Sequence, residues 1–248
     1  MNKAMQYDSK KTDLKKIYYK AYDERYRKVH EEGILWELTD PSPVVEKFLK
    51  LNNASSSSKI LDLGCGEGRD AIYLLDKGYN VLAVDYSQNT IDKCNELTNN
   101  IFKKNFKQLD LFDNNLKTKY DFIYSISVLH MFVLDEHRIK FFEFIYNHLK
   151  KNGKALVTVL GDGNKEKKSN INEAISITER TVQKTNKKIN VTATSCRIVD
   201  WNTLESEVLS NKLIIEKNGF IMKYLDLVNQ CVLLLAKKRE VIWKSINN

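Results

Sequence analysis

The 248-residue sequence predicts an α/β protein built on a mostly parallel sheet, and two observations carry this prediction. Between residues 59 and 161, short apolar runs alternate regularly with amphipathic segments, the pattern of strands joined by crossover helices. Near the C-terminus, two further apolar runs, residues 220–228 and 231–237, are separated by only two residues. So short a link forces antiparallel pairing. We therefore expect a parallel sheet that ends in a hairpin.

Composition narrows the class of protein. Hydrophobic residues make up 42% and charged residues 29% of the chain, as in a globular domain. No apolar run approaches the roughly 18 residues of a membrane span, and residues 1–16 carry no apolar core of a signal peptide. The four cysteines are far apart. We therefore expect a cytoplasmic protein without a metal site or a membrane association.

The net charge of +8 raises the question of a nucleic-acid partner. The basic residues, however, form short scattered clusters, such as Lys103-Lys104 and Lys187-Lys188, and none is interleaved with aromatic residues as in a stacking surface. A solvated surface explains these clusters better than an RNA-binding groove. Nucleic acid is therefore an unlikely partner, and the sequence does not indicate an oligomeric state.

Residues 1–58 are expected to form an N-terminal helical cap. A helix over residues 14–32 carries tyrosines at helical spacing, and Gly33 ends it. Ser42-Pro43 has the residue types of a helix start, and it predicts a second helix through residues 44–51.

Residues 59–161 are expected to form the ligand-binding core. The expected strands cover residues 60–63, 81–85, 106–109, 121–127 and 155–160. The expected helices cover residues 70–77, 87–98 and 135–150, with Ser87 as the cap of the second of these and Gly78 ending the first.

The remaining chain departs from this alternation within the same single domain. Residues 162–200 read as a polar insertion that serves as a lid, with one helix over residues 171–182. Residues 201–248 are expected to hold a helix over 201–217 and the terminal hairpin.

A glycine-rich turn after the first strand indicates the chemistry. Gly64, Gly66 and Gly68 follow the GxGxG spacing, whereas nicotinamide-cofactor proteins use GxGxxG at this place. Asp62 precedes the first glycine by two positions, and a carboxylate there would repel a pyrophosphate. It suits a cationic ligand without phosphate, and S-adenosylmethionine (SAM), with its sulfonium and ammonium groups, is such a ligand.

Two more acidic residues end the next two strands. Asp85 is placed to accept hydrogen bonds from both ribose hydroxyls, and Asp110 to accept one from the adenine amino group, with Leu111 packed on the ring. Each acid alone could be a plain cap or turn residue. Acids at three successive strand ends, together with GxGxG, predict binding of SAM and of its product S-adenosyl-L-homocysteine (SAH).

From about residue 59 to 237 the sequence resembles the class I SAM-dependent methyltransferases. The resemblance implies a Rossmann-like, doubly wound, mostly parallel seven-stranded sheet with a reversed last strand. The stretch Gly64 to Asp85, with Arg69, and the run Ser125 to Phe132 look most like the tellurite-resistance methyltransferases. Trp36, ahead of the two prolines, is similar to the N-terminal segment of thiol methyltransferases. The long insertion after residue 161 departs from the tellurite type, so that substrate is not carried over.

The resemblance also excludes two acceptor classes. Amino methyltransferases that act on DNA or glutamine resemble one another in an Asn/Asp-Pro-Pro-Tyr loop after the fourth strand, and this chain has Ser125-Ile126-Ser127-Val128 there. DNA cytosine methyltransferases use a cysteine that follows a proline as their nucleophile, and no cysteine of this chain follows a proline.

Two residues are candidates for a general base, which a hydroxyl or ammonium acceptor needs. His130 follows the fourth strand, and the alternative for it is a structural histidine at the start of the next helix. Asp162 follows the fifth strand, and the alternative is a turn residue between two glycines. The other histidines, His30, His137 and His148, lie on helical segments and read as surface residues.

The remaining expected cofactor contacts are Cys65, Arg69, Tyr86, Ser125 and Trp36. Arg69 is placed to pair with the methionyl carboxylate, although a solvated arginine is an equal alternative.

The sequence thus predicts transfer of a methyl group from SAM to a small-molecule acceptor by in-line displacement. An RNA or protein methyltransferase is the alternative, and a nicotinamide-dependent oxidoreductase or a non-catalytic SAM-binding protein fits the motifs less well. Transfer requires a cover that excludes water. Only the segments 18–36 and 162–194 lie outside the core alternation, and we expect the acceptor to lie between them.

Overall fold

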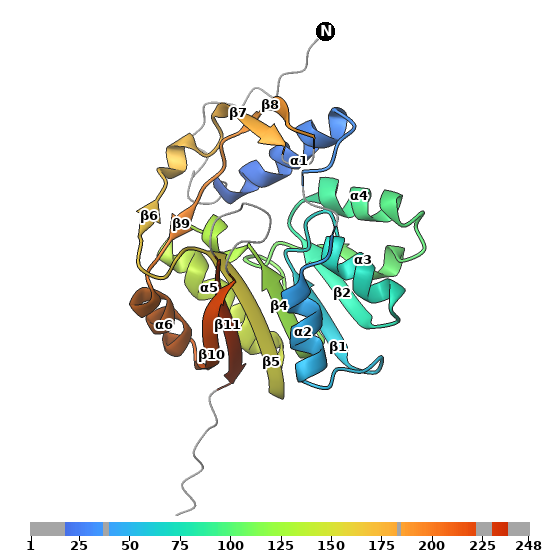
Figure 1. Cartoon of the computed structure of the whole chain (residues 1–248), viewed down its shortest axis with the longest axis vertical. Coiled ribbons are helices and arrows are strands. Elements are labelled where there is room, and N and C mark those ends of the chain that lie inside the picture. The colour runs from blue at the N-terminus through green and yellow to red at the C-terminus, as the bar shows by residue number, and fades with distance from the viewer. Residues whose placement is uncertain (1–17, 37–39, 183–184, 222–229, 238–248) are drawn as a thin grey trace, which may run out of the picture.

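The protein folds around one seven-stranded sheet, described here from a computed structural model covering residues 18–36, 40–182, 185–221 and 230–237 (Figure 1). The strand order is β10-β11-β5-β4-β1-β2-β3. Strands β1 to β5 pair in parallel, whereas β11 runs antiparallel to both of its neighbours. The predicted Rossmann-like sheet with a reversed last strand is therefore confirmed.

The main sheet has seven strands, of which the first five follow one another along the chain as predicted. They are β1 (Lys59–Leu63), β2 (Asn80–Asp85), β3 (Phe106–Gln108), β4 (Tyr120–Ile126), β5 (Leu149–Leu160), β10 (Leu213–Ile221) and β11 (Gln230–Lys237). Strand β5 begins six residues earlier than expected, because the preceding helix ends at His148 and Gly153 lies within the strand.

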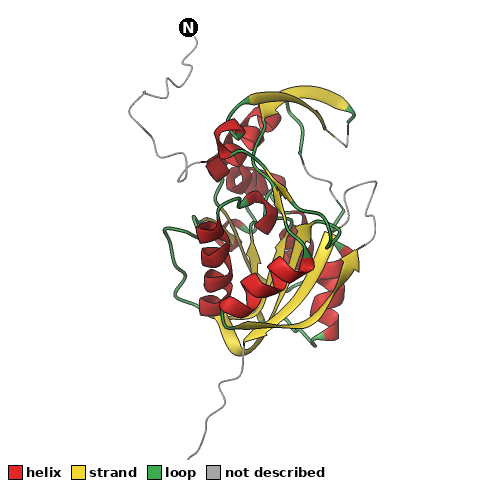
Figure 2. Ribbon diagram, turned by 90° about the vertical axis from the view of Figure 1, so that its left-hand side faces the viewer, coloured by secondary structure: helices red, strands yellow, loops and turns green. Residues whose placement is uncertain are grey.

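Helices cover both faces of the sheet (Figures 1 and 2). They are α1 (Ala21–Glu31), α2 (Pro43–Leu51), α3 (Arg69–Asp76), α4 (Gln88–Leu97), α5 (Asp135–His148) and α6 (Trp201–Ser210). Ser87 caps α4 by accepting from the Thr90 N–H, as predicted. Pro43 occupies the first position of α2, and Gly78, at φ +79°, follows α3.

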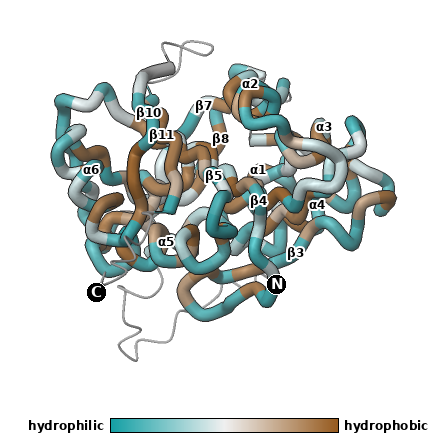
Figure 3. Tube along the Cα trace, turned by 90° about the horizontal axis from the view of Figure 1, so that it is seen from below, coloured by the Kyte–Doolittle hydropathy of each residue, from teal (hydrophilic) through white to brown (hydrophobic). Residues whose placement is uncertain are grey.

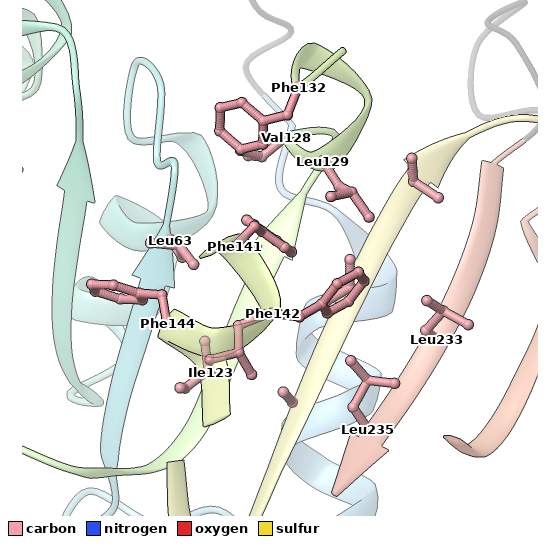
Figure 4. Packing of buried hydrophobic residues seen from close by; sticks show 14 of the residues in the cluster. Leu63, Ile123, Val128, Leu129, Phe132, Phe141, Phe142, Phe144, Leu233 and Leu235 are labelled. Carbon is pink, nitrogen blue, oxygen red and sulfur yellow. The ribbon is translucent and has the colours of Figure 1, made fainter. Parts of the chain in front are cut away.

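Alternate strand residues supply the two halves of the core, since successive side chains point to opposite faces. One half joins Leu61, Ile123 and Val157 to α5 and α6, and Figure 4 shows part of it around Phe141 and Phe142. The other half joins Ile60 and Phe122 to helices α2, α3 and α4. Figure 3 shows that β11, which lies between β10 and β5 in the sheet, is largely hydrophobic.

The predicted helix over residues 171–182 is wrong. A short 3-10 turn (Ile171–Glu173) is followed by β7 (Ile177–Val182), which pairs antiparallel with β8 (Lys187–Thr192). The sequence Ile177-Thr178-Glu179-Arg180-Thr181-Val182 is rich in β-branched residues, which favour a strand. A second small pair joins β6 (Lys167–Lys168) to β9 (Arg197–Ile198).

The C-terminal boundaries also differ from the prediction. The helix expected over residues 201–217 ends at Ser210, and β10 begins at Leu213 after Lys212, which has φ +59°. The expected first strand of the hairpin, residues 220–228, lies mostly outside the described residues. The antiparallel pairing is confirmed, but Gln230 already pairs with Ile221, so the two-residue link Asn229-Gln230 is wrong.

Candidate active site

A cavity of about 1210 Å³ lies at the carboxyl ends of the parallel strands. Ligands of open α/β sheets bind at this edge. The volume exceeds the range of roughly 300–1,000 Å³ typical for one drug-sized ligand. The cavity therefore has room for two ligands side by side, such as a cofactor and an acceptor.

The turn after β1 has a shape that only glycine permits at two positions. Gly64 has φ +83°, and a Cβ atom built there would lie 2.4 Å from Cγ2 of Val128. Gly68 has φ +81°, and its Cβ would lie 2.7 Å from Sγ of Cys94. The backbone N–H groups of Gly64 and Cys65 both donate to the Val84 carbonyl, which fixes the turn against β2. Gly64 and Cys65 also line the cavity.

Asp85 joins the end of β2 to this turn. Its Oδ2 accepts a hydrogen bond from the Gly66 N–H at 2.9 Å, and its Oδ1 accepts one from the Ser87 N–H at 2.9 Å. Desolvation raises the pKa of Asp85, and the two backbone hydrogen bonds oppose this shift. A carboxylate has about four acceptor positions, so Asp85 can also accept from a ligand's hydroxyl groups.

The other two strand-end acids also line the cavity. Asp62 lies in β1 and is buried. Asp110 follows β3, and its Oδ2 accepts from the Tyr19 hydroxyl at 2.9 Å while its Oδ1 accepts from the Phe112 N–H at 3.0 Å. The structure therefore brings the three predicted acids to one cavity.

Most of the other predicted cofactor contacts lie at the same wall. Tyr86, Leu111, Trp36 and Arg69 line the cavity. The Arg69 guanidinium donates to Ser42 Oγ at 2.7 Å and lies 3.4 Å from Asp70 Oδ2. Arg69 is thus held beside the start of α2 rather than solvated.

Four predicted site residues do not line the cavity: Gly66 and Gly68 of the turn, Ser125 and Asp162. Ser125 is fully buried in β4, and its Oγ donates to the Leu63 carbonyl at 2.7 Å, so it ties β4 to β1. Asp162 accepts from the N–H groups of Asn164 and Lys165, which is the turn role weighed as its alternative. The predicted contact of Ser125 with the cofactor and the predicted base role of Asp162 are therefore not supported by their positions.

His130 lines the cavity, but its electrostatics do not suit a strong base. It is buried, and its Nδ1 has no hydrogen-bond partner among the residues described. Burial, with the positive charges of Arg138 and Arg25, lowers the pKa of His130 to about 3. The imidazole is therefore neutral at physiological pH. Of the three histidines predicted to lie at the surface, His137 and His148 are buried and the His30 side chain is only 12% exposed, which corrects that expectation.

The N-terminal segment and the β7–β8 hairpin cover the cavity together (Figure 1). Arg25 donates to the carbonyls of Thr192 (2.8 Å) and Ala193 (2.7 Å), and Tyr22 donates to the Ser195 carbonyl at 3.1 Å. Arg180 and Thr181 of β7 line the cavity from the hairpin side. The two segments expected to enclose the acceptor thus lie side by side above the strand ends.

Sequence reasoning missed several residues of the site. Tyr19 is one of the tyrosines at helical spacing in the N-terminal segment, and no pattern in the neighbouring sequence indicated its hydrogen bond to Asp110. Ser127, with φ +58°, lines the cavity directly after β4, where Ser125 was expected. Lys47 and Phe48 of α2 and Val232 of β11 also line the cavity, and no sequence pattern indicated them.

A family model for the tellurite resistance protein TehB matches residues 37–166, slightly more than half of the chain. The chain belongs to the TehB family. Curated relatives include a ubiquinone biosynthesis O-methyltransferase of Rickettsia conorii (32% identity over 138 residues, 54% of this chain and 45% of that protein). Another is a probable SAM-dependent methyltransferase TehB of Haemophilus influenzae (29% identity over 145 residues, 57% and 46%). The chain spans about half the length of the curated relatives it matches.

Solved structures of methyltransferases share the fold. A SAM-dependent methyltransferase from Clostridium acetobutylicum superimposes with a TM-score of 0.60 at 18% identity, covering 88% of this chain and 98% of that one. A Burkholderia thailandensis 1,6-didemethyltoxoflavin-N1-methyltransferase, with SAH bound, gives 0.66 at 14% identity and covers 90% and 89%. The TehB family member described here therefore has the class I methyltransferase fold that its sequence resembles.

None of the helices in the described part of the chain is long and apolar enough to cross a membrane. Within the same residues, no group of three His, Cys, Asp or Glu side chains lies close enough together to hold a metal ion.

Proposed function

We propose that this TehB family member is a SAM-dependent methyltransferase that methylates a small-molecule acceptor by in-line displacement. The observation that carries the proposal is the hydrogen bond from the Gly66 N–H to Asp85, whose side chain lines the cavity. It presents a carboxylate with free acceptor positions beside a glycine turn that excludes side chains. The proposal is supported by the methyltransferase names of the relatives and by the SAH bound in the toxoflavin enzyme.

The residues of the cavity fit SAM. The glycine turn admits a ligand close to the backbone, and the three carboxylates Asp62, Asp85 and Asp110 line the cavity beside it. Asp85 would hold the ribose hydroxyls, Asp110 with Leu111 the adenine, and Asp62 the ammonium group. Arg69, with Cys65 and Tyr86, would complete the contacts. When bound, SAM supplies a methyl group already activated by its positive sulfur.

The chain's own contribution is then alignment and exclusion of water. Helix α1 and the β7–β8 hairpin cover the place of transfer, and Tyr22, Tyr26 and Trp36 supply aromatic walls. His130 positions the acceptor as a neutral hydrogen-bonding group, because a base whose pKa is about 3 removes few protons at neutral pH. The favoured acceptor therefore carries an atom that is nucleophilic without a strong base, such as a thiolate.

A covered cavity also argues for a small acceptor over RNA or protein. A macromolecule would have to present its acceptor group beneath α1 and the hairpin, which the Arg25 hydrogen bonds hold together. We also place the protein in the cytoplasm, since its cysteines are free thiols and all but one are buried.

The test is transfer of a labelled methyl group. The purified protein is incubated with methyl-labelled SAM and a cell extract separated into low-mass, RNA and protein fractions. The proposal expects label in the low-mass fraction only. Label in RNA, lost on ribonuclease treatment, or label in protein would overturn the small-molecule acceptor, and no transfer to any fraction would contradict the proposed activity.

A further inference from the structure

Glu67 stands in the middle of the glycine turn, between Gly66 and Gly68, but it does not line the cavity. Its side chain is 3% exposed. A buried carboxylate is costly unless hydrogen bonds compensate it. Its partners therefore indicate what it does.

Two of its partners lie in the N-terminal segment. Glu67 Oε1 accepts a hydrogen bond from the Trp36 backbone N–H at 2.9 Å, and the same oxygen lies 2.7 Å from His30 Nε2. His30 is in the last turn of α1, and Trp36 follows the bend at Gly33, where φ is +70°. One oxygen atom of Glu67 in the glycine turn thus holds His30 and Trp36, which lie on the two sides of the bend that follows α1.

A second set of contacts continues from Trp36 to the hairpin. The Arg25 guanidinium lies 4.8 Å above the Trp36 ring, a cation–π contact. Arg25 also donates to the Thr192 and Ala193 carbonyls at the end of β8. Trp36 and Arg25 both line the cavity. A continuous set of contacts therefore leads from the glycine turn through Glu67 to both covering segments.

We propose that Glu67 is a positioning residue. It couples the binding of a cofactor at the glycine turn to the placement of Trp36 and Arg25, which form a wall of the acceptor site. The inference rests on the proposed function, because it takes SAM and SAH as the ligands of the turn. A glycine-rich turn has several accessible backbone conformations, and a ligand that binds one of them selects it. Glu67 moves with the turn, so the selected conformation also fixes Trp36. The cofactor should therefore bind before the acceptor.

The test uses SAH as the probe, with calorimetric affinity and backbone hydrogen exchange measured on the same samples. In the wild type, saturating SAH should slow exchange in residues 21–31 and 187–192 by about tenfold. Glu67→Ala removes both hydrogen bonds. It should keep SAH affinity within about tenfold of wild type, since Glu67 does not line the cavity, yet lose the protection in both segments.

Two variants separate coupling from a merely structural role. Glu67→Gln retains a carbonyl oxygen that accepts from Trp36 and His30, so it should restore the protection. Glu32→Ala breaks the exposed Glu32–Lys187 ion pair, which joins α1 to β8 without touching the glycine turn. It should leave the SAH-dependent protection unchanged.

The inference is overturned if Glu67→Ala shows wild-type protection on binding SAH, or if Glu32→Ala loses it equally. Wild-type binding of SAH without protection of the two segments would also overturn it. If Glu67→Ala does not fold, His30→Ala is the test. The SAH-dependent protection of residues 21–31 should then fall to less than half of its wild-type value, and full retention of that protection contradicts the coupling. Absence of SAH binding by the wild type is a different result, which contradicts the proposed function.

Discussion

Asp85 accepts a hydrogen bond from the Gly66 backbone N–H at 2.9 Å, so the acid that ends β2 and the turn that follows β1 form one unit. The parallel pairing of Leu63 with Val84 brings the two strand ends to the same level. A ligand that enters the turn therefore meets the carboxylate at a fixed place.

Replacing Asp85 by alanine should weaken SAH binding by at least about 100-fold, or roughly 3 kcal/mol, because charge-assisted hydrogen bonds contribute about 1.5–3 kcal/mol each. Calorimetric titration of SAH measures the change. Asp162→Ala is the matched control, since Asp162 lies in a turn outside the cavity and its loss should leave the affinity unchanged. Unaltered affinity in Asp85→Ala would remove Asp85 from the ribose site.

Gly64→Ala should destabilise the fold through two effects. The φ of +83° costs about 1–2 kcal/mol for alanine, and the approach of the new methyl group to Val128 Cγ2 at 2.4 Å adds about 1–3 kcal/mol of overpacking. Gly78→Ala is the control, since Gly78 has a similar φ of +79° and nothing within 4 Å of the added atom.

Urea unfolding of the two variants separates the effects. Gly64→Ala should lose more stability than Gly78→Ala, and the additional change Val128→Ala should recover part of the difference. Equal losses in Gly64→Ala and Gly78→Ala would show that Val128 does not restrict the turn.

The alternation of strands and helices in the core was predictable because it depends on local patterns of apolar residues. The glycine turn and the three acids were predictable for the same reason: parallel strands place their carboxyl ends together whatever the rest of the chain does. Ser125 shows that such patterns do not predict which single residue at the end of a strand reaches the cavity. A shift of one or two residues decides whether a serine faces the sheet or the cavity, and Ser127 has the cavity position.

Contacts between distant segments could not be predicted. The Tyr19–Asp110 bond joins residues 91 positions apart, and the Glu67–Trp36 bond joins residues 31 apart. The prediction of a helix over residues 171–182 is wrong for the same reason. The β-branched residues 177–182 instead pair with residues 187–192, which a local pattern does not show.

His130 should make the protein sensitive to acid. Its pKa of about 3 in the folded protein lies below the unfolded value of about 6.5. Between these values the unfolded chain binds a proton that the folded chain does not, so stability falls as pH decreases, by at most about 1.4 kcal/mol per pH unit. Above pH 6.5 the effect is absent.

His130→Gln removes this titration. Urea unfolding at pH 7 and pH 5 should therefore show a larger loss of stability for the wild type than for His130→Gln, by up to about 2 kcal/mol. An equal loss in both proteins would mean that His130 is protonated in the folded state, and its role as a neutral group would then be wrong.

Parallel calorimetric titrations of SAH and NADH show whether the cavity is a SAM site built on a glycine turn and strand-end carboxylates. We expect saturable binding of one SAH per chain, weakened at least about 100-fold in Asp85→Ala, and no binding of NADH, whose pyrophosphate meets Asp62. Binding of NADH in place of SAH, or SAH binding that survives Asp85→Ala unchanged, would contradict this assignment of the cavity.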